Sequence, residues 1–234
     1  YDEIANPYTG VLADQEQENP VYAYYVPNGS NYDVYFLADD VIYSPKDSSS
    51  LYQGMSALTT VDTTNYSFSR VEKMQKMFSE CGKLTTLDTT GWDTSNITNM
   101  QGMFYKCNAL SEITGITDWN VSSLENLYAT FYNMHAMTEL DLSGWNVSNV
   151  TDLRSAIRAN NNLSYVNLSG WDIISACDAT CMLANNPALV TIDGTGMNMA
   201  GITNAYAMLG YNSSLTNIEG SDDWTFPNLT DASY

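Results

Sequence analysis

The chain has 234 residues, with 27 acidic and 8 basic side chains, a single histidine and a formal charge of −19. That length suits one large domain or two small ones, and 44% apolar residues can build a real core. The negative charge excludes ordinary nucleic-acid binding, because phosphate recognition needs clustered Lys and Arg. The single His135 excludes a multi-histidine metal centre. No apolar run of about 18 residues occurs, so we expect no membrane insertion by this segment.

The first 44 residues form a unit of their own in this interpretation. Residues 21–26 and 32–42 are rich in Tyr, Val and Phe, and residues 27–31 between them read Pro-Asn-Gly-Ser-Asn, which is a turn signal. We therefore predict an acidic N-terminal segment followed by a β-hairpin. The hairpin is expected to cap the first coil of the repeat domain over residues 45–234, since the apolar end of a repeat array needs a cover.

From residue 45 onward the sequence repeats every 26 or 27 residues. Each unit begins a short strand-like run with an apolar residue, at Leu58, Leu84, Leu110, Met137, Leu163, Leu189 and Leu215. A large side chain follows eight or nine positions later, and all five tryptophans fall in this column: Trp92, Trp119, Trp145, Trp171 and Trp224. A unit of this size cannot bury its own apolar side, so the copies must stack into a solenoid with the Trp column in its core.

The second half of each unit has apolar residues at spacings of three and four, as in Ile97, Met100, Met103 and Phe104. That spacing predicts one face of a short helix. The expected fold is therefore an α/β solenoid of the leucine-rich-repeat type, with about seven strand–helix coils and the hairpin cap. The last copy breaks off soon after Leu229, within a predicted helix, so we expect the natural chain to continue beyond residue 234.

The run MFSECGKLTTLDTTGWDTSNITNMQGMF, from Met77 to Phe104, resembles the BspA-like leucine-rich repeat of mainly bacterial surface proteins. That family's unit reads roughly MF..C..L..LDLS.(F/W)DTSNVTNM..MF. The resemblance covers residues 45–234 and is strongest over 74–168. It implies a cell-surface or secreted location and a role in adhesion, with no catalytic residues to carry over. The Cys of the unit matches at Cys81 and Cys107 and is then replaced, by Met134, Asn160, Asn186 and Asn212.

Alternate residues of each predicted strand face outward, and many of them are carboxylates or hydroxyls one rung apart. One interpretation is a broad polar recognition face, or shallow calcium sites; the other is a solvated face that keeps the strands soluble. No D-x-D-x-D-G loop supports calcium, and we expect no cofactor and no metal. The candidate binding residues are Asp62, Asp88, Glu112, Glu139, Asp141, Asp193 and Glu219.

The cysteines are expected to be thiols. Cys81 and Cys107 occupy equivalent positions in adjacent coils, where buried thiols are favoured over a disulfide. Cys177 and Cys181 lie four residues apart on a predicted helix face, a poor disulfide geometry and at best half of a zinc site.

These patterns favour a non-enzymatic extracellular solenoid that serves as an adhesion or binding scaffold for a protein or glycan ligand. One alternative is a structural subunit of a surface filament or layer, assembled from copies of itself through open strand edges. A glycan-active enzyme is a third hypothesis. If the strand face does not bind, recognition moves to the hairpin cap or to the predicted helix side, where Lys73, Lys76, Lys106, Arg154 and Arg158 collect.

Overall fold

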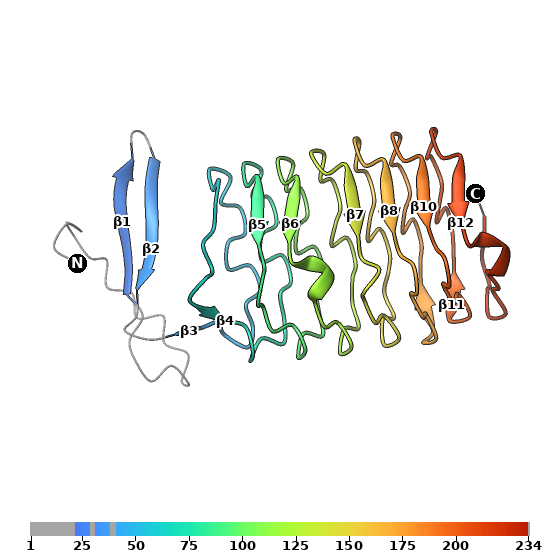
Figure 1. Cartoon of the computed structure of the whole chain (residues 1–234), viewed down its shortest axis with the longest axis horizontal. Coiled ribbons are helices and arrows are strands. Elements are labelled where there is room, and N and C mark those ends of the chain that lie inside the picture. The colour runs from blue at the N-terminus through green and yellow to red at the C-terminus, as the bar shows by residue number, and fades with distance from the viewer. Residues whose placement is uncertain (1–21, 29–30, 38–40, 234) are drawn as a thin grey trace.

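The computed structural model describes residues 22–28, 31–37 and 41–233, with side chains from residue 41 onward. Over this last range the chain winds into a β-solenoid of about seven turns, and Figure 1 shows its coils stacked along one axis. Among the described residues, no helix has the length and apolar character needed to cross a bilayer.

The predicted hairpin region contains two paired strands. β1 (Tyr22–Asn28) and β2 (Asn31–Leu37) run antiparallel, with Tyr22 opposite Leu37 and Asn28 opposite Asn31. Whether the hairpin caps the solenoid depends on side chains that the structure does not describe. The predicted acidic segment before the hairpin also lies outside the described residues. The cap and the boundary at residue 44 therefore stay predictions.

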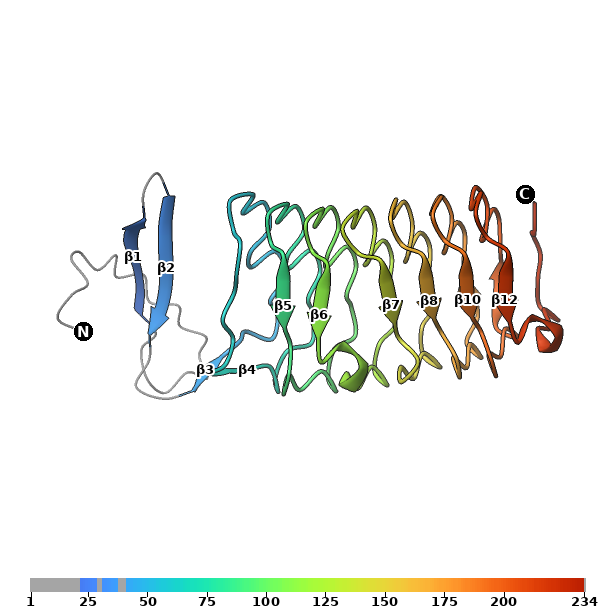
Figure 2. The same cartoon turned by 45° about the horizontal axis from the view of Figure 1, so that its top comes forward.

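The first face of the solenoid is a ladder of parallel three-residue strands, which lie side by side in Figure 2. β5 pairs with β6, while β7, β8, β10 and β12 pair in that order. The middle residue of each strand points into the core and its two neighbours face outward, which is the alternation that a half-buried strand requires. The strands are β5 (Thr86–Asp88), β6 (Glu112–Thr114), β7 (Glu139–Asp141), β8 (Tyr165–Asn167), β10 (Thr191–Asp193) and β12 (Asn217–Glu219).

The remaining elements are short. β3 (Ile42–Tyr43) pairs in parallel with β4 (Tyr66–Ser67), and β9 (Cys177–Asp178) with β11 (Ile202–Asn204). The 3₁₀ turns η1 (Ile116–Asp118) and η2 (Ser221–Asp223) each follow a left-handed glycine. Both occur where the tryptophan comes nine residues after the opening apolar residue, so each turn accommodates the extra residue of its unit.

The described residues contain no α-helix, so the prediction of strand–helix, leucine-rich-repeat coils was wrong. In the stretch predicted as a helix, the N–H groups of Met74, Lys76, Phe78 and Glu80 donate to main-chain oxygens of the next coil at 2.7–2.9 Å. The N–H groups of Met77 and Ser79 close turns onto the oxygens of Met74 and Lys76, three positions back. A helix would instead direct each N–H to the residue four positions back.

Left-handed residues explain why the helix does not form. Lys76 and Glu80 have φ of 55° and 65°, and the equivalent Gly102 and Lys106 have φ of 62° and 60°. A left-handed residue at every fourth position ends a right-handed helix after each turn. The turns that result are three or four residues long, so they direct apolar residues inward with the spacing of a helix. The apolar spacing alone did not distinguish these turns from a helix.

The core is built from columns of similar side chains. Trp92, Trp119, Trp145 and Trp171 are buried, and Trp224 in the last coil is half-buried. The ring centroid of Trp119 lies 5.9 Å from that of Trp92 and 5.8 Å from that of Trp145. In the first coil Phe68 continues the column, with its ring centroid 3.9 Å from that of Trp92. The stacking of this column sets the register between coils, which decides which outer side chains lie next to one another.

Candidate functional site

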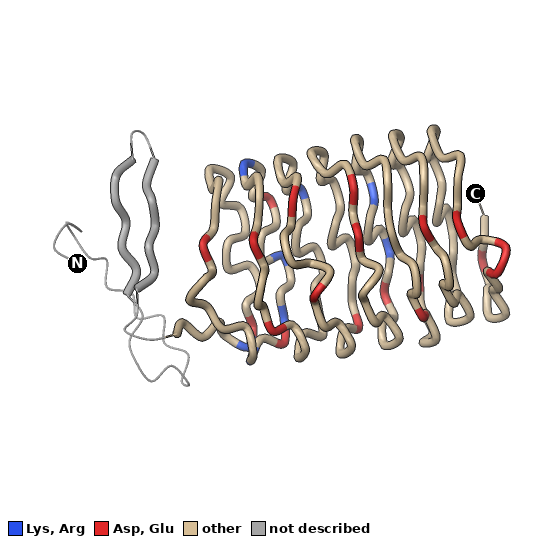
Figure 3. The backbone as a smooth tube through the Cα atoms, viewed as in Figure 1, with Lys and Arg blue, Asp and Glu red and all other residues tan. Residues whose placement is uncertain are grey.

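The predicted strand-face carboxylates lie along the first ladder and the coil before it. They are exposed, apart from the half-buried Asp193. Figure 3 shows the acidic positions in red along the solenoid. The residues are Asp62, Asp88, Glu112, Glu139, Asp141, Asp193 and Glu219.

The aspartates of this face have a local structural use. The N–H of Thr64 donates to Asp62 Oδ1 at 2.9 Å, and the N–H of Thr90 donates to Asp88 Oδ1 at 2.9 Å. Asp141 and Asp193 each accept the same bond from the residue two positions on, at 3.0 Å. This arrangement is an Asx turn, which bends the chain out of the strand. The aspartates are therefore explained in part by turn formation.

These turns also stabilise the ionised carboxylates. The hydroxyl and the N–H of Thr64 lower the pKa of Asp62, and those of Thr90 lower the pKa of Asp88. Hydrogen bonds to the charged form have this effect, and here they outweigh the opposing effect of desolvation. No group of three or more His, Cys, Asp or Glu side chains that could hold a metal ion occurs in the described part of the chain. The geometry therefore gives the calcium interpretation no support.

The four cysteines are free thiols, and Cys81, Cys107 and Cys177 are buried. Burial raises the pKa of Cys81 to about 11 and that of Cys107 and Cys177 to about 12. Thiols that stay protonated at neutral pH are poor nucleophiles and poor metal ligands. These three cysteines therefore belong to the core.

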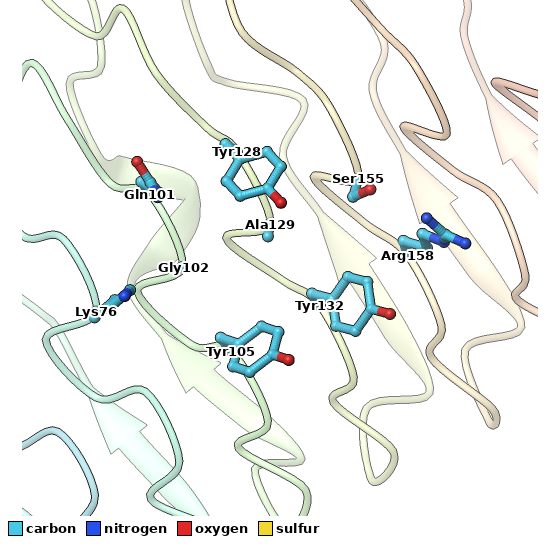
Figure 4. A pocket seen from close by; sticks show the side chains of 9 residues that line it. All are labelled: Lys76, Gln101, Gly102, Tyr105, Tyr128, Ala129, Tyr132, Ser155 and Arg158. Atoms are coloured by element: carbon cyan, nitrogen blue, oxygen red, sulfur yellow. The ribbon is translucent and has the colours of Figure 1, made fainter. Parts of the chain in front are cut away.

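A second face of the solenoid carries a groove of about 460 Å³. In Figure 4 Gln101 and Tyr128 lie on one side of the groove, Tyr105 and Tyr132 on the other, and Gly102 and Ala129 between them. The lining comes from four consecutive coils and comprises Lys76, Gln101, Gly102, Tyr105, Tyr128, Ala129, Tyr132, Ser155 and Arg158.

The left-handed turns create the hollow. Gly102, Ala129 and Ser155 are equivalent left-handed residues of three successive coils, and all three are small. A Cβ atom on Gly102 would lie 3.4 Å from Lys76 Cγ and 3.7 Å from Tyr105 Cβ, so a larger residue there would fill the space. The column of left-handed residues that prevents a helix therefore also forms the floor of the groove.

The tyrosine rings are stacked between cations. The ring centroids of Tyr105 and Tyr132 lie 5.2 Å apart. Lys106 Nζ lies 5.1 Å from the Tyr105 centroid, and Arg158 Cζ lies 6.0 Å from that of Tyr132. On the other side of the groove, Arg154 lies 5.1 Å from the Tyr128 centroid. Tyr105 and Tyr132 thus each have a stacked ring and a cation close to the ring, which leaves mainly their hydroxyls and ring edges for a ligand.

Two cations of the groove lack an anionic partner. Arg154 pairs with Asp152 at 2.7 Å, whereas neither Lys76 nor Arg158 forms an ion pair with any residue that the structure describes. The Nε atom of Arg158 is buried and has no hydrogen-bond partner. In a chain with 27 acidic residues, cations left unpaired beside three tyrosines mark a site suited to an anionic ligand.

The sequence located part of this groove. It grouped Lys76, Lys106, Arg154 and Arg158 on one side of the solenoid but did not include the tyrosines. The 27-residue interval between Tyr105 and Tyr132 was the available signal, since residues one unit apart stack. The fifth residue of that predicted group, Lys73, does not line the groove and forms parallel β-bridges with Asp47 and Asn99 in the neighbouring coils.

Comparison with known proteins gives one match. The family described as "Mycoplasma protein of unknown function, DUF285" matches residues 44–115 and 109–224. The repeat character of the chain is thereby supported, whereas the BspA-like family is not confirmed. No curated protein and no solved structure matches the chain.

Proposed function

On the premise that the chain belongs to the DUF285 family of Mycoplasma proteins of unknown function, we propose that it is a non-enzymatic binding scaffold. It works outside the cell, on a surface or in secreted form, and holds a protein or glycan partner in adhesion. The main recognition surface is the groove lined by Tyr105, Tyr128 and Tyr132, instead of the strand-face carboxylates.

The observation that carries this proposal is that neither Lys76 nor Arg158, which line the groove with the tyrosines, forms an ion pair with a described residue. The rest of the molecule is strongly acidic, so these cations define a local site of opposite sign. Tyrosine and arginine are also the residue types that most often dominate binding energy at protein interfaces. An anionic partner would neutralise the two cations and accept hydrogen bonds from the phenol hydroxyls.

The composition of the groove supports binding without chemistry. Its lining side chains include no carboxylate, imidazole or thiol, the groups that most often act as general bases or nucleophiles. Ser155, the hydroxyl that might be activated, lies three coils away from Lys76. The groove is therefore better suited to holding a partner than to transforming it.

The experiment compares the two faces directly. Retention of the intact chain on an array of anionic and neutral peptides and glycans is measured for two double variants, Lys76→Gln with Arg158→Gln and Asp88→Asn with Asp141→Asn. We expect the groove pair to lower affinity at least tenfold and the strand-face pair to leave it unchanged. If only the strand-face pair lost binding, the recognition surface would be the carboxylates of the strand ladder instead of the groove.

A further inference from the structure

We propose that the groove binds an extended acidic peptide with carboxylates four residues apart, and that Asp14–Glu18 of this chain is such a segment. The inference rests on the proposed function, because it names the ligand class of the same groove. It is carried by the geometry of the groove and by its charge.

The occupied ring faces favour a peptide carboxylate over a stacked sugar. Tyr105 and Tyr132 stack on each other, and Lys106 and Arg158 also lie over these two rings. A sugar that binds an aromatic residue by stacking needs an open ring face. Hydroxyls, an ammonium group and a guanidinium group instead donate hydrogen bonds to carboxylate oxygens.

The spacing of the cations sets the length of the ligand. Lys76 lies on the first and Arg158 on the fourth of four coils, which main-chain bonds join from Lys76 to Gln101, Gly102 to Tyr128 and Ala129 to Arg154. Three rungs of a parallel ladder span about 14 Å. Four residues of an extended chain span about 13 Å, whereas four residues of a helix rise only about 6 Å. Along the solenoid axis, the coils of the two cations are therefore separated by about the length that joins carboxylates at positions i and i+4 of an extended peptide.

The chain itself contains this pattern. Asp14, Glu16 and Glu18 alternate with Gln15 and Gln17, and alternate residues of an extended chain share one face. The outer two carboxylates would meet the two cations, and the middle one would meet the tyrosine hydroxyls. Residues 14–18 lie outside the described residues, so the match rests on their sequence alone.

The test uses a labelled synthetic peptide of residues 11–20, VLADQEQENP, titrated into the full chain by fluorescence anisotropy. The chain carries Asp14→Asn, Glu16→Gln and Glu18→Gln, so that its own segment does not compete. We expect saturable binding that weakens as salt is raised. The affinity should fall tenfold or more when Lys76→Gln or Arg158→Gln is added.

Two controls separate site binding from general charge attraction. Lys46→Gln with Lys83→Gln removes two positive charges outside the groove lining and should leave the affinity unchanged. A peptide with the three acids neutralised should not bind. Equal binding of the neutral peptide, or equal losses in the groove and control variants, would overturn the proposal.

An additional arm distinguishes this inference from the proposed function. If the groove retains an anionic glycan and not the peptide, the peptide inference fails while the binding scaffold stands. If neither probe distinguishes the groove variants from the controls, both fail.

Discussion

The main-chain N–H of Asn160 donates to the Oδ1 atom of Asn186, 2.8 Å away in the next coil. Asn186 is fully buried, and its Nδ2 atom donates to Ile157 O at 2.9 Å and to Leu183 O at 2.8 Å. Cys107, one of the cysteines in this column, donates from Sγ to Phe78 O at 3.0 Å, which is likewise 29 residues back. Apart from Met134, whose side chain has no donor, the column thus changes from Cys to Asn while it keeps one hydrogen bond between coils.

The first prediction follows from this buried amide. Asn186→Leu would leave the Asn160 N–H and the Ile157 oxygen without partners inside the core. We expect the free energy of unfolding to fall by about 2–4 kcal/mol, because each buried unsatisfied group carries its desolvation cost. Urea denaturation measures the loss. The exposed Asn161→Ala should change stability by less than about 0.5 kcal/mol, and equal effects of the two changes would contradict the ladder.

The second prediction concerns the tryptophan column. Trp145 is 2% exposed, and its Nε1 atom donates to Ile116 O at 2.9 Å. Trp145→Ala should cost about 3–5 kcal/mol, as large core deletions do. Trp224→Ala should cost clearly less, since that ring is half-buried and its hydrogen bond is long, at 3.4 Å. Native fluorescence at the wavelength of solvent-exposed tryptophan would be inconsistent with the buried column.

The third prediction distinguishes the β-solenoid from the helix that the spacing of apolar residues predicted. Glu80 is exposed and has φ of 65°, a conformation that costs a residue with a Cβ atom roughly 1–2 kcal/mol. Glu80→Gly should therefore raise stability by about 0.5–1 kcal/mol after the added chain entropy of glycine is subtracted.

The matched control for this change is Lys83→Gly. Lys83 is also exposed and is not among the residues with positive φ, so glycine there should lower stability by roughly 0.5–1 kcal/mol. In a helix, glycine at position 80 would cost about 1 kcal/mol. A loss of stability at both positions in thermal denaturation would argue for the helix.

The fourth prediction concerns acid. The pKa values of Asp62 and Asp88 lie below the ordinary 3.8, so their contribution is complete above that pH and is lost as pH falls through the lowered values. Asp62→Asn with Asp88→Asn should keep the turn bonds, as Asn167 does with the N–H of Ser169 at 3.0 Å. The variant should lose less stability than the natural chain as the pH falls from about 4 through the lowered pKa values. Parallel stability curves in urea would show that the charges contribute nothing.

The repeat and its inward positions could be predicted from the sequence, because the period and the tryptophan column follow directly from core packing. The helix could not be excluded, since turns of three and four residues place apolar side chains inward as a helix does. Gly54 and Gly102 hint at left-handed positions, whereas Lys76 and Glu80 adopt the same conformation without a sequence signal. Bonds to the next coil stabilise that conformation, and they are not visible in one unit.

The residues of the groove could be predicted only in part, because its contacts also form between coils. The sequence grouped the cations, but the contact between tyrosines and cations depends on where each coil turns. Tyr132 and Arg158 are 26 residues apart and become neighbours only through stacking. For the strand-face aspartates the sequence pattern was visible but ambiguous. A repeated aspartate is expected in an Asx turn as well as in a recognition surface.

Tyrosine footprinting tests the central claim most directly, because both faces carry a reporter. The rate of nitration is compared for the free chain and for the chain bound to the array component that retains it best. We predict that Tyr105, Tyr128 and Tyr132 become protected, while Tyr165 on β8 and Tyr211, which is 69% exposed, react as before. Protection of Tyr165 with unchanged rates at the three groove tyrosines would contradict the account and place recognition on the strand face.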